Sequence, residues 1–107
     1  MEIYENILAT LGETPLVRLA RFSPEGAALA AKVEYFNPGH SVKDRIGIAM
    51  IEAAERSGTL RPGGTIVEPT SGNTGVGLAM AAALKGYRMI CTAADKIPKE
   101  KVALLEA

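Results

Sequence analysis

The chain has 107 residues, 48% of them apolar and 22% charged, and its 12 basic and 12 acidic side chains cancel to a net charge of zero. This length holds one ordinary domain, and the apolar fraction excludes a disordered chain. The absence of a basic block argues against binding to nucleic acid or an anionic membrane, and the single cysteine excludes a disulfide framework. Because the N-terminus is acidic and no apolar run approaches the ~20 residues of a membrane span, we expect a soluble, cytoplasmic protein.

The first forty residues predict a short helix and two strands. A helical lead over 3–11 precedes an alternating segment over 14–19, and a second alternating segment covers 30–36. In the second strand, Glu34 is expected on the polar face. The run Asn37-Pro38-Gly39 then ends that strand.

From residue 30 onward, strand and helix patterns alternate. A helix over 41–56 begins with Ser41 as N-cap and Asp44 three residues later, which is the pattern of a capping box. It is followed by a strand over 65–68, an apolar helix over 76–85 that should be buried on most sides, a strand over 87–93 and a last helix over 98–107. Apolar strands separated by helices predict βαβ units. The expected fold is therefore α/β, with an open, mostly parallel sheet and helices on both faces.

The first strand-to-helix turn with unusual chemistry leads to Lys43. A helix N-terminus carries about half a positive charge, so an ammonium group there is disfavoured, more so if the apolar Val42 and Ile46 help to bury it. Such a lysine suits Schiff-base chemistry, because only the neutral amine attacks a carbonyl group. The alternative, which residue statistics alone favour, is a solvated Lys43 paired with Asp44 or another carboxylate.

The second such turn is Thr70-Ser71-Gly72-Asn73-Thr74-Gly75, between a strand and the apolar helix. Backbone N–H groups, three hydroxyls and one amide meet there at the positive end of the helix dipole, which suits an anion. Because the turn contains no Lys or Arg, a single carboxylate fits better than a polyphosphate. The alternative is a turn whose glycines only allow the helix and the strand to pack closely.

Nucleotide and metal motifs are not found. The glycine order of the second turn is the reverse of the dinucleotide fingerprint, and a P-loop is absent. Asp95 lies about 20 residues beyond the turn, where a ribose-binding acid would stand, so dinucleotide binding remains an alternative. His40 has no second metal ligand near it, and Cys91 is expected to be a small buried hydrophobe.

Two segments taken together, Ser41-Val42-Lys43-Asp44-Arg45 and Glu68-Pro69-Thr70-Ser71-Gly72-Asn73-Thr74-Gly75, resemble the paired signatures of the cysteine synthase and cystathionine β-synthase family. These are pyridoxal-phosphate enzymes of fold type II. The resemblance extends over nearly the whole chain and reverses the preference between the two interpretations of Lys43. Val42 and the intact loop favour this family over the threonine dehydratases and threonine synthases.

By this resemblance, Lys43 holds pyridoxal 5′-phosphate as a Schiff base and then acts as the base that moves the substrate α-proton. Asn73 matches a residue that contacts the 3′-oxygen of the cofactor. The substrate-binding loop of the family is matched by Thr70, Ser71, Gly72, Asn73 and Thr74. The implied reaction is a β-replacement that forms L-cysteine from O-acetylserine and sulfide through an aminoacrylate. The alternatives are cystathionine β-synthase activity on serine and homocysteine, or a non-catalytic nucleotide-binding or interaction domain.

The chain departs from the family pattern in three places. His40 stands where relatives often have Gly, and Asp95-Lys96 resembles the cystathionine β-synthase side. The phosphate-binding loop of the family is absent, so we expect the N-terminal portion of a longer, homodimeric enzyme, with poor cofactor affinity on its own. Residues 1–40 would supply strands to a larger sheet, and residues 41–107 would form a βαβ-rich subdomain that carries the substrate loop.

Overall fold

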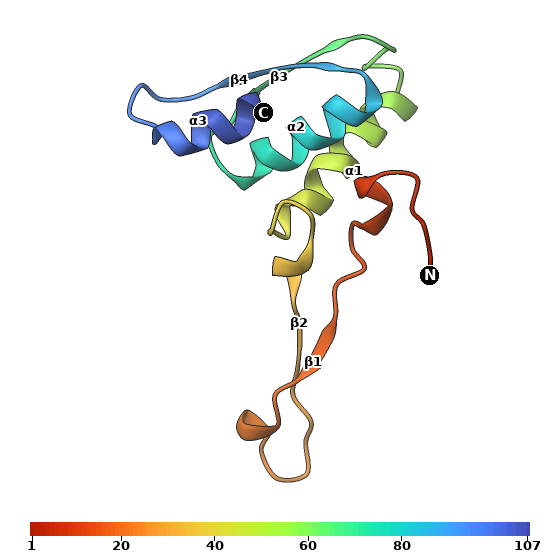
Figure 1. The fold of residues 1–107 in the computed structure, drawn as a ribbon, viewed down its shortest axis with the longest axis vertical. Helices are drawn as coiled ribbons and strands as arrows, with labels where there is room; N and C mark the ends of the chain where they lie inside the picture. The colour runs from red at the N-terminus through yellow and green to blue at the C-terminus, as the bar shows by residue number, and fades with distance from the viewer.

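The computed structural model describes residues 1–107 and has extents of 53 × 36 × 29 Å (Figure 1). No helix in it is both long enough and apolar enough to cross a bilayer. In chain order the elements are η1 (Ile7–Thr10), β1 (Leu16–Arg18), η2 (Ala20–Phe22), β2 (Ala30–Lys32), η3 (Glu34–Phe36), α1 (Lys43–Arg56), β3 (Thr65–Pro69), α2 (Asn73–Lys85), β4 (Arg88–Thr92) and α3 (Lys99–Glu106), where η marks a 3-10 helix.

The two N-terminal strands form a hairpin that projects from the rest of the molecule (Figure 1). β1 and β2 are antiparallel, with Val17 opposite Ala31, and no other strand pairs with them. The hairpin leaves large apolar side chains in solvent, including Leu16 and Phe22, which are 69% and 76% exposed. Membership of residues 1–40 in a larger sheet stays a prediction.

The prediction of one strand over 30–36 is wrong in its second half. The strand ends at Lys32, and Glu34–Phe36 forms η3 instead. Glu34 is consequently half-buried rather than on a polar strand face, because its carboxylate turns toward Arg45. This turn also separates β2 from β3, so the strand-and-helix alternation from residue 30 does not place β2 in the parallel sheet.

The second sheet is the predicted βαβ unit. β3 and β4 are parallel, with Val67 opposite Ile90, and α2 connects them. Their carboxyl ends, Pro69 and Thr92, therefore lie at the same edge, where ligands bind in open α/β sheets. Gly86 ends α2 with a φ of 75°, a left-handed conformation that favours glycine, as the sequence predicts.

The core lies where α1 crosses α2. Ile51 of α1 packs with Leu78, Ala81 and Ala82 of α2 in one fully buried cluster. The backbones approach so closely that a Cβ on Gly47 would lie 2.6 Å from the backbone nitrogen of Leu78. α2 is less enclosed than the sequence predicts, because its opposite face, with Leu84 47% exposed, borders a cavity.

The far end of this helix pair is joined by a polar cluster. Glu55 of α1 accepts hydrogen bonds from the Lys85 ammonium at 2.9 Å and from the Tyr87 hydroxyl at 2.7 Å. The hydrogen bond from Lys85, followed by that from Tyr87, lowers the pKa of the Glu55 carboxyl. This cluster connects the C-terminal halves of α1 and α2 to the beginning of β4.

We predict that Gly47→Ala destabilises the protein by about 1–3 kcal/mol, because the added methyl group would force the two helix backbones apart. Alanine is otherwise the better helix former by about 1 kcal/mol, so the sign of the change is diagnostic. Urea unfolding followed by circular dichroism measures it, with Ala49→Ser on the exposed side of α1 as the control. A gain in stability from Gly47→Ala would show that the helices are not held at this spacing.

Candidate functional site

Lys43 is the first residue of α1, as the sequence predicts to within two residues. Its backbone N–H donates to the Ser41 hydroxyl at 3.1 Å, while the N-cap position itself belongs to Val42. Its side chain is exposed, and none of the three ion pairs of the structure involves it. The expectation that Val42 and Ile46 bury it is wrong, because both are themselves about 40% exposed, at 43% and 39%.

The loop in front of Lys43 is held by side chains. Asn37 is 1% exposed and donates through Nδ2 to the Ser41 carbonyl at 3.2 Å. His40 has a φ of 58°, the one non-glycine residue in the left-handed region, and its ring stacks on Tyr35 at 5.2 Å. A residue with a Cβ is uncommon in this region of backbone conformation.

The predicted capping box does not form. Asp44 turns its Oδ2 toward the N–H of Gly39 at 2.5 Å, and its hydrogen bond with Ser41 is a backbone one, from Asp44 N to the Ser41 carbonyl at 3.2 Å. The reason is that Ser41 precedes the N-cap residue by one position, and its hydroxyl accepts the N–H of Lys43 rather than that of Asp44. The Asp44 carboxylate therefore holds the loop through the backbone N–H of Gly39.

An ion-pair network joins this loop to the N-terminal segment. Arg45 binds Glu34 through two hydrogen bonds, Nε to Oε2 at 2.7 Å and Nη2 to Oε1 at 2.9 Å. It also donates to the Gly12 carbonyl at 3.0 Å, and Asn37 accepts the N–H of Gly12 at 2.9 Å. The Arg45 hydrogen bonds lower the pKa of the Glu34 carboxyl to about 2. Paired geometry of this kind gives strength and direction to an ion pair.

No local pattern in the sequence points to this network. Glu34 fits an alternating strand pattern, and Asn37 fits a turn, so neither shows a sign of long-range pairing. Arg45 gave the one available signal, since a second cation in the first turn of a helix is unfavourable unless a carboxylate balances it. The identity of that carboxylate, 11 residues earlier in the chain, depends on the tertiary fold.

The predicted carboxylate loop lies at the beginning of α2. Thr70 uses its hydroxyl to accept the N–H of Gly75 at 3.1 Å, and the N–H of Val76 donates to the Gly72 carbonyl at 3.2 Å. Asn73 and Thr74 are the first two residues of α2, so their N–H groups have no intrahelical partner. The loop thus keeps free donors at the positive end of a helix, which suits a carboxylate.

Beside this loop is a groove of about 370 Å³ between the carboxyl ends of β3 and β4. Its lining is Pro69, Thr70, Ser71, Thr92, Ala93 and Ala94. Ser71 and Asn73 are exposed, while Thr70, Gly72 and Thr74 are half-buried. Of the predicted site residues, Thr70 and Ser71 therefore line one open groove at the sheet edge.

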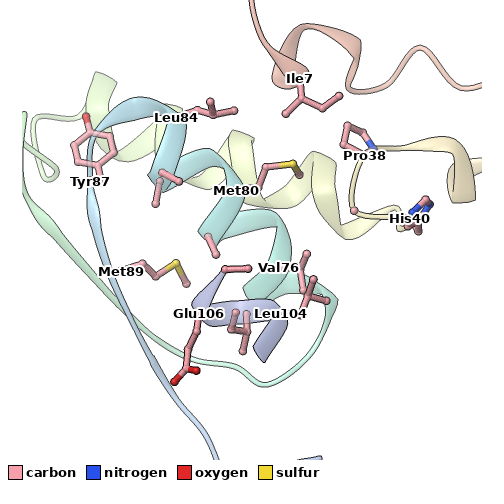
Figure 2. Close-up of a pocket in the computed structure, with 16 residues that line it drawn as sticks. Ile7, Pro38, His40, Val76, Met80, Leu84, Tyr87, Met89, Leu104 and Glu106 are labelled. Carbon is pink, nitrogen blue, oxygen red and sulfur yellow. The ribbon is translucent and has the colours of Figure 1, made fainter. Parts of the chain in front are cut away.

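A larger, mostly apolar cavity of about 710 Å³ lies on the other side of α2. Figure 2 shows Val76 and Met80 of α2 and Leu104 of α3 on its wall, with Pro38 and His40 from the loop before Lys43 at one end. Neither Lys43 nor the loop residues 70–74 line this cavity. No cluster of metal-binding side chains is present anywhere in the structure.

The two predicted halves of the site meet through the helix crossing. A Cβ on Gly77 of α2 would lie 2.9 Å from the Lys43 carbonyl oxygen. Asn73 precedes Gly77 by four residues, or about 6 Å along the helix axis. The backbone of Lys43 therefore packs about one helical turn into α2, and the predicted carboxylate loop precedes that same helix.

Comparisons with known proteins agree with this geometry. A family model described as pyridoxal-phosphate dependent enzyme matches residues 7–107. The chain belongs to this family, whose members are enzymes that use pyridoxal phosphate. Within the family it is similar to cystathionine β-synthase of Rattus norvegicus, at 56% identity over 99% of the chain, and to a probable cysteine synthase of Bacillus subtilis, at 52% identity over 100%.

Solved structures support the same placement. The O-ureido-L-serine synthase structure is similar with a TM-score of 0.87 at 48% identity, and cysteine synthase from Entamoeba histolytica with a TM-score of 0.89 at 42% identity; each match covers 98% of the chain. These confirm the predicted α/β fold of type II. The chain spans 19% of the rat relative, 35% of the Bacillus relative and about a third of each solved chain, 33% and 32%.

The residues present fit part of the family cofactor. Lys43 offers a primary amine without an ion-pair partner, which is what an aldehyde requires, and Asn73 offers a neutral amide donor. No arginine or lysine stands in the 70–75 loop, so this loop is suited to a carboxylate rather than to the cofactor phosphate.

We predict that the protein loses stability as the pH falls from about 4.5 to about 2, and that Glu34 contributes to this loss. Glu34 has its pKa lowered from 4.5 to about 2 in the folded state, so the unfolded chain takes up the proton first. The contribution of the pair is complete above the ordinary pKa and disappears below the folded one. Urea unfolding midpoints across this range measure it.

In the same series, Glu34→Gln is expected to lower stability at neutral pH and to flatten the acid limb of the curve. The control is Glu25→Gln, an exposed carboxylate with no partner among the side-chain hydrogen bonds or ion pairs. An acid limb equally steep in Glu34→Gln would assign the pH dependence to other groups.

Proposed function

We propose that the protein carrying this chain is a β-replacement enzyme that forms L-cysteine from O-acetylserine and sulfide. The observation that supports this is the crossing of α1 and α2, which packs the backbone of Lys43, the first residue of α1, against Gly77, about one turn into the helix that follows the 70–75 loop. An enzyme that acts on an α-amino acid in this way needs both groups. The lysine amine holds the cofactor aldehyde, and the loop donors bind the carboxylate of the substrate. The family membership supplies the cofactor class.

In this proposal Lys43 serves the cofactor and the substrate α-proton, Asn73 serves both the cofactor and the substrate, and the other loop residues bind the substrate carboxylate. Pyridoxal phosphate, when bound, supplies an aldehyde for a lysine amine and a ring that accepts the charge developing at the substrate α-carbon. Lys43 holds the cofactor through its amine and, once released by the substrate, takes the α-proton and later returns it. Asn73 would donate to the 3′-oxygen of the cofactor. The α-carboxylate of the substrate would be bound by hydroxyls, amides and free N–H groups of Thr70, Ser71, Gly72, Asn73 and Thr74.

A second candidate is cystathionine β-synthase activity, with serine and homocysteine as substrates. It is favoured by the 56% identity to the rat enzyme, against 52% to the Bacillus cysteine synthase, and by the pair Asp95-Lys96. Both candidates share the same β-replacement chemistry. Product analysis of the protein expressed from its complete gene, with each donor and each thiol in turn, separates them.

The proposal also extends to the whole protein. We propose that it is cytoplasmic and that it works as a homodimer on a small amino-acid substrate and a sulfur nucleophile, without nucleic acid or membrane partners. Light scattering of the purified protein tests the dimer, and a mass of one protomer would contradict it.

We predict that Lys43→Ala abolishes the visible absorption band that pyridoxal phosphate acquires on condensing with a lysine amine, and lowers activity by roughly 10²–10⁴-fold. Absorption spectra of the protein expressed from its complete gene, with added pyridoxal phosphate, measure the first effect. The control is Lys85→Ala, which removes an amine engaged with Glu55. A band that survives Lys43→Ala would contradict the assignment, and no band in the native protein would favour a non-catalytic nucleotide-binding or interaction domain.

We predict that Thr70→Ala and Asn73→Ala weaken substrate binding roughly tenfold while the cofactor band changes less, because each removes about one hydrogen bond to the substrate carboxylate. Titration of the native band with the amino-acid substrate gives the affinity. Thr65→Ala, at the other end of β3, is the control. Equal losses of substrate and cofactor binding would mean that the loop has a structural role.

A further inference from the structure

Asp44, which follows the candidate Schiff-base lysine, is buried in an unusual way. It is 0% exposed, and its Oδ1 is the one buried side-chain oxygen or nitrogen atom without a hydrogen-bond partner. Burial raises the pKa of the Asp44 carboxyl, although the backbone of Gly39, the nearby His40 and the backbone of Ser41 act in the opposite direction. A half-paired carboxylate in the interior destabilises a fold, so its presence calls for a reason other than stability.

Asp44 is closely packed against backbone on two sides. A Cβ on Gly39 would lie 2.5 Å from the unpaired Oδ1, so the loop lies directly against the carboxylate. On the opposite side, a Cβ on Gly77 would lie 3.0 Å from the Asp44 Cα. The start of α1 is therefore enclosed between the loop of residues 39–42 and the backbone of α2.

The hydrogen bond from Gly39 to Asp44 closes the loop that precedes Lys43. Within this loop, the N–H of Lys43 is bound to the Ser41 hydroxyl, and Asn37 holds the Ser41 carbonyl from outside. Three hydrogen bonds thus hold the loop up to the backbone of Lys43, while the Lys43 side chain remains exposed. A fixed backbone with a free side chain is the arrangement that presents an amine in one direction.

We propose that Asp44 is a positioning residue for Lys43, which holds the Gly39 N–H and so fixes the direction in which the Lys43 amine leaves the start of α1. This inference rests on the proposed function, in which Lys43 is the reacting amine. Asp44 touches no reacting atom and acts through the loop.

The test is the rate at which the lysine–cofactor absorption band develops after pyridoxal phosphate is added to the cofactor-free protein. We expect Asp44→Ala to slow this rate by roughly tenfold, because it removes the charge-assisted hydrogen bond from Gly39. We expect the rate of band formation for Asp44→Asn to lie between the rates of the native protein and of Asp44→Ala. The Asn carbonyl is a neutral and weaker acceptor of the Gly39 N–H. Glu52→Gln, a carboxylate of α1 that only approaches Arg56 at 3.9 Å, should match the native rate.

Two further measurements separate positioning from folding. We expect Asp44→Asn to melt no earlier than the native protein, because it removes the cost of burying a charge, while the band still develops more slowly. Hydrogen exchange of the cofactor-free Asp44 variants should become faster in the segment 39–43 and remain unchanged in the C-terminal half of α1. If Asp44→Ala does not fold, Asp44→Asn carries the test alone.

The outcomes are distinct. The proposal would be overturned if Asp44→Asn showed the native rate of band formation and the native hydrogen exchange. It would also be overturned if band formation slowed only in variants with a lower melting temperature. A native protein without a Lys43-dependent band would overturn the proposed function instead, and the exchange data would then decide whether Asp44 fixes the loop. Slower band formation at an unchanged melting temperature supports the positioning role.

Discussion

The close approach of α1 and α2 is the constraint on which the rest of the structure depends. Gly47 and Gly77 have no side chains, so backbone meets backbone where the helices cross. This contact accompanies the small core around Ile51 and Leu78, and it places the first turn of α1 against the second turn of α2. A helix start provides free N–H groups and a positive potential, which is the physical basis for the anion site that we propose at the start of α2.

The Arg45–Glu34 ion pair connects the start of α1 to the N-terminal segment. Through Gly12 and Asn37, it joins the segment before the projecting hairpin to the loop that carries Lys43. The hairpin beyond this junction has little packing of its own, and its apolar side chains are exposed. One bidentate ion pair and one buried amide thus fix the loop geometry, while the hairpin depends on them for its attachment.

Asp44 illustrates how stability and function can oppose each other at such a site. An interior carboxylate with one unpaired oxygen is unfavourable, whereas the Glu55 cluster at the other end of the helix pair satisfies both carboxylate oxygens. The same helix pair therefore contains a polar group that stabilises it and one that does not. The unsatisfied group is adjacent to Lys43, the residue that we propose holds the cofactor.

The sequence by itself determined the elements from residue 41 onward and the two strand-to-helix turns at Lys43 and at residues 70–75. Their signals are local: helical periodicity, glycine caps, and hydroxyls or a lysine at a helix start. It also indicated the family, which the comparisons confirm. Only the tertiary structure decided that the second strand ends at Lys32, that Glu34 pairs with Arg45, and that Asp44 binds Gly39 rather than capping its own helix. The Glu34–Arg45 pair joins residues 11 positions apart, and the Gly39–Asp44 bond spans five positions across an irregular loop, so neither leaves a periodic pattern in the sequence.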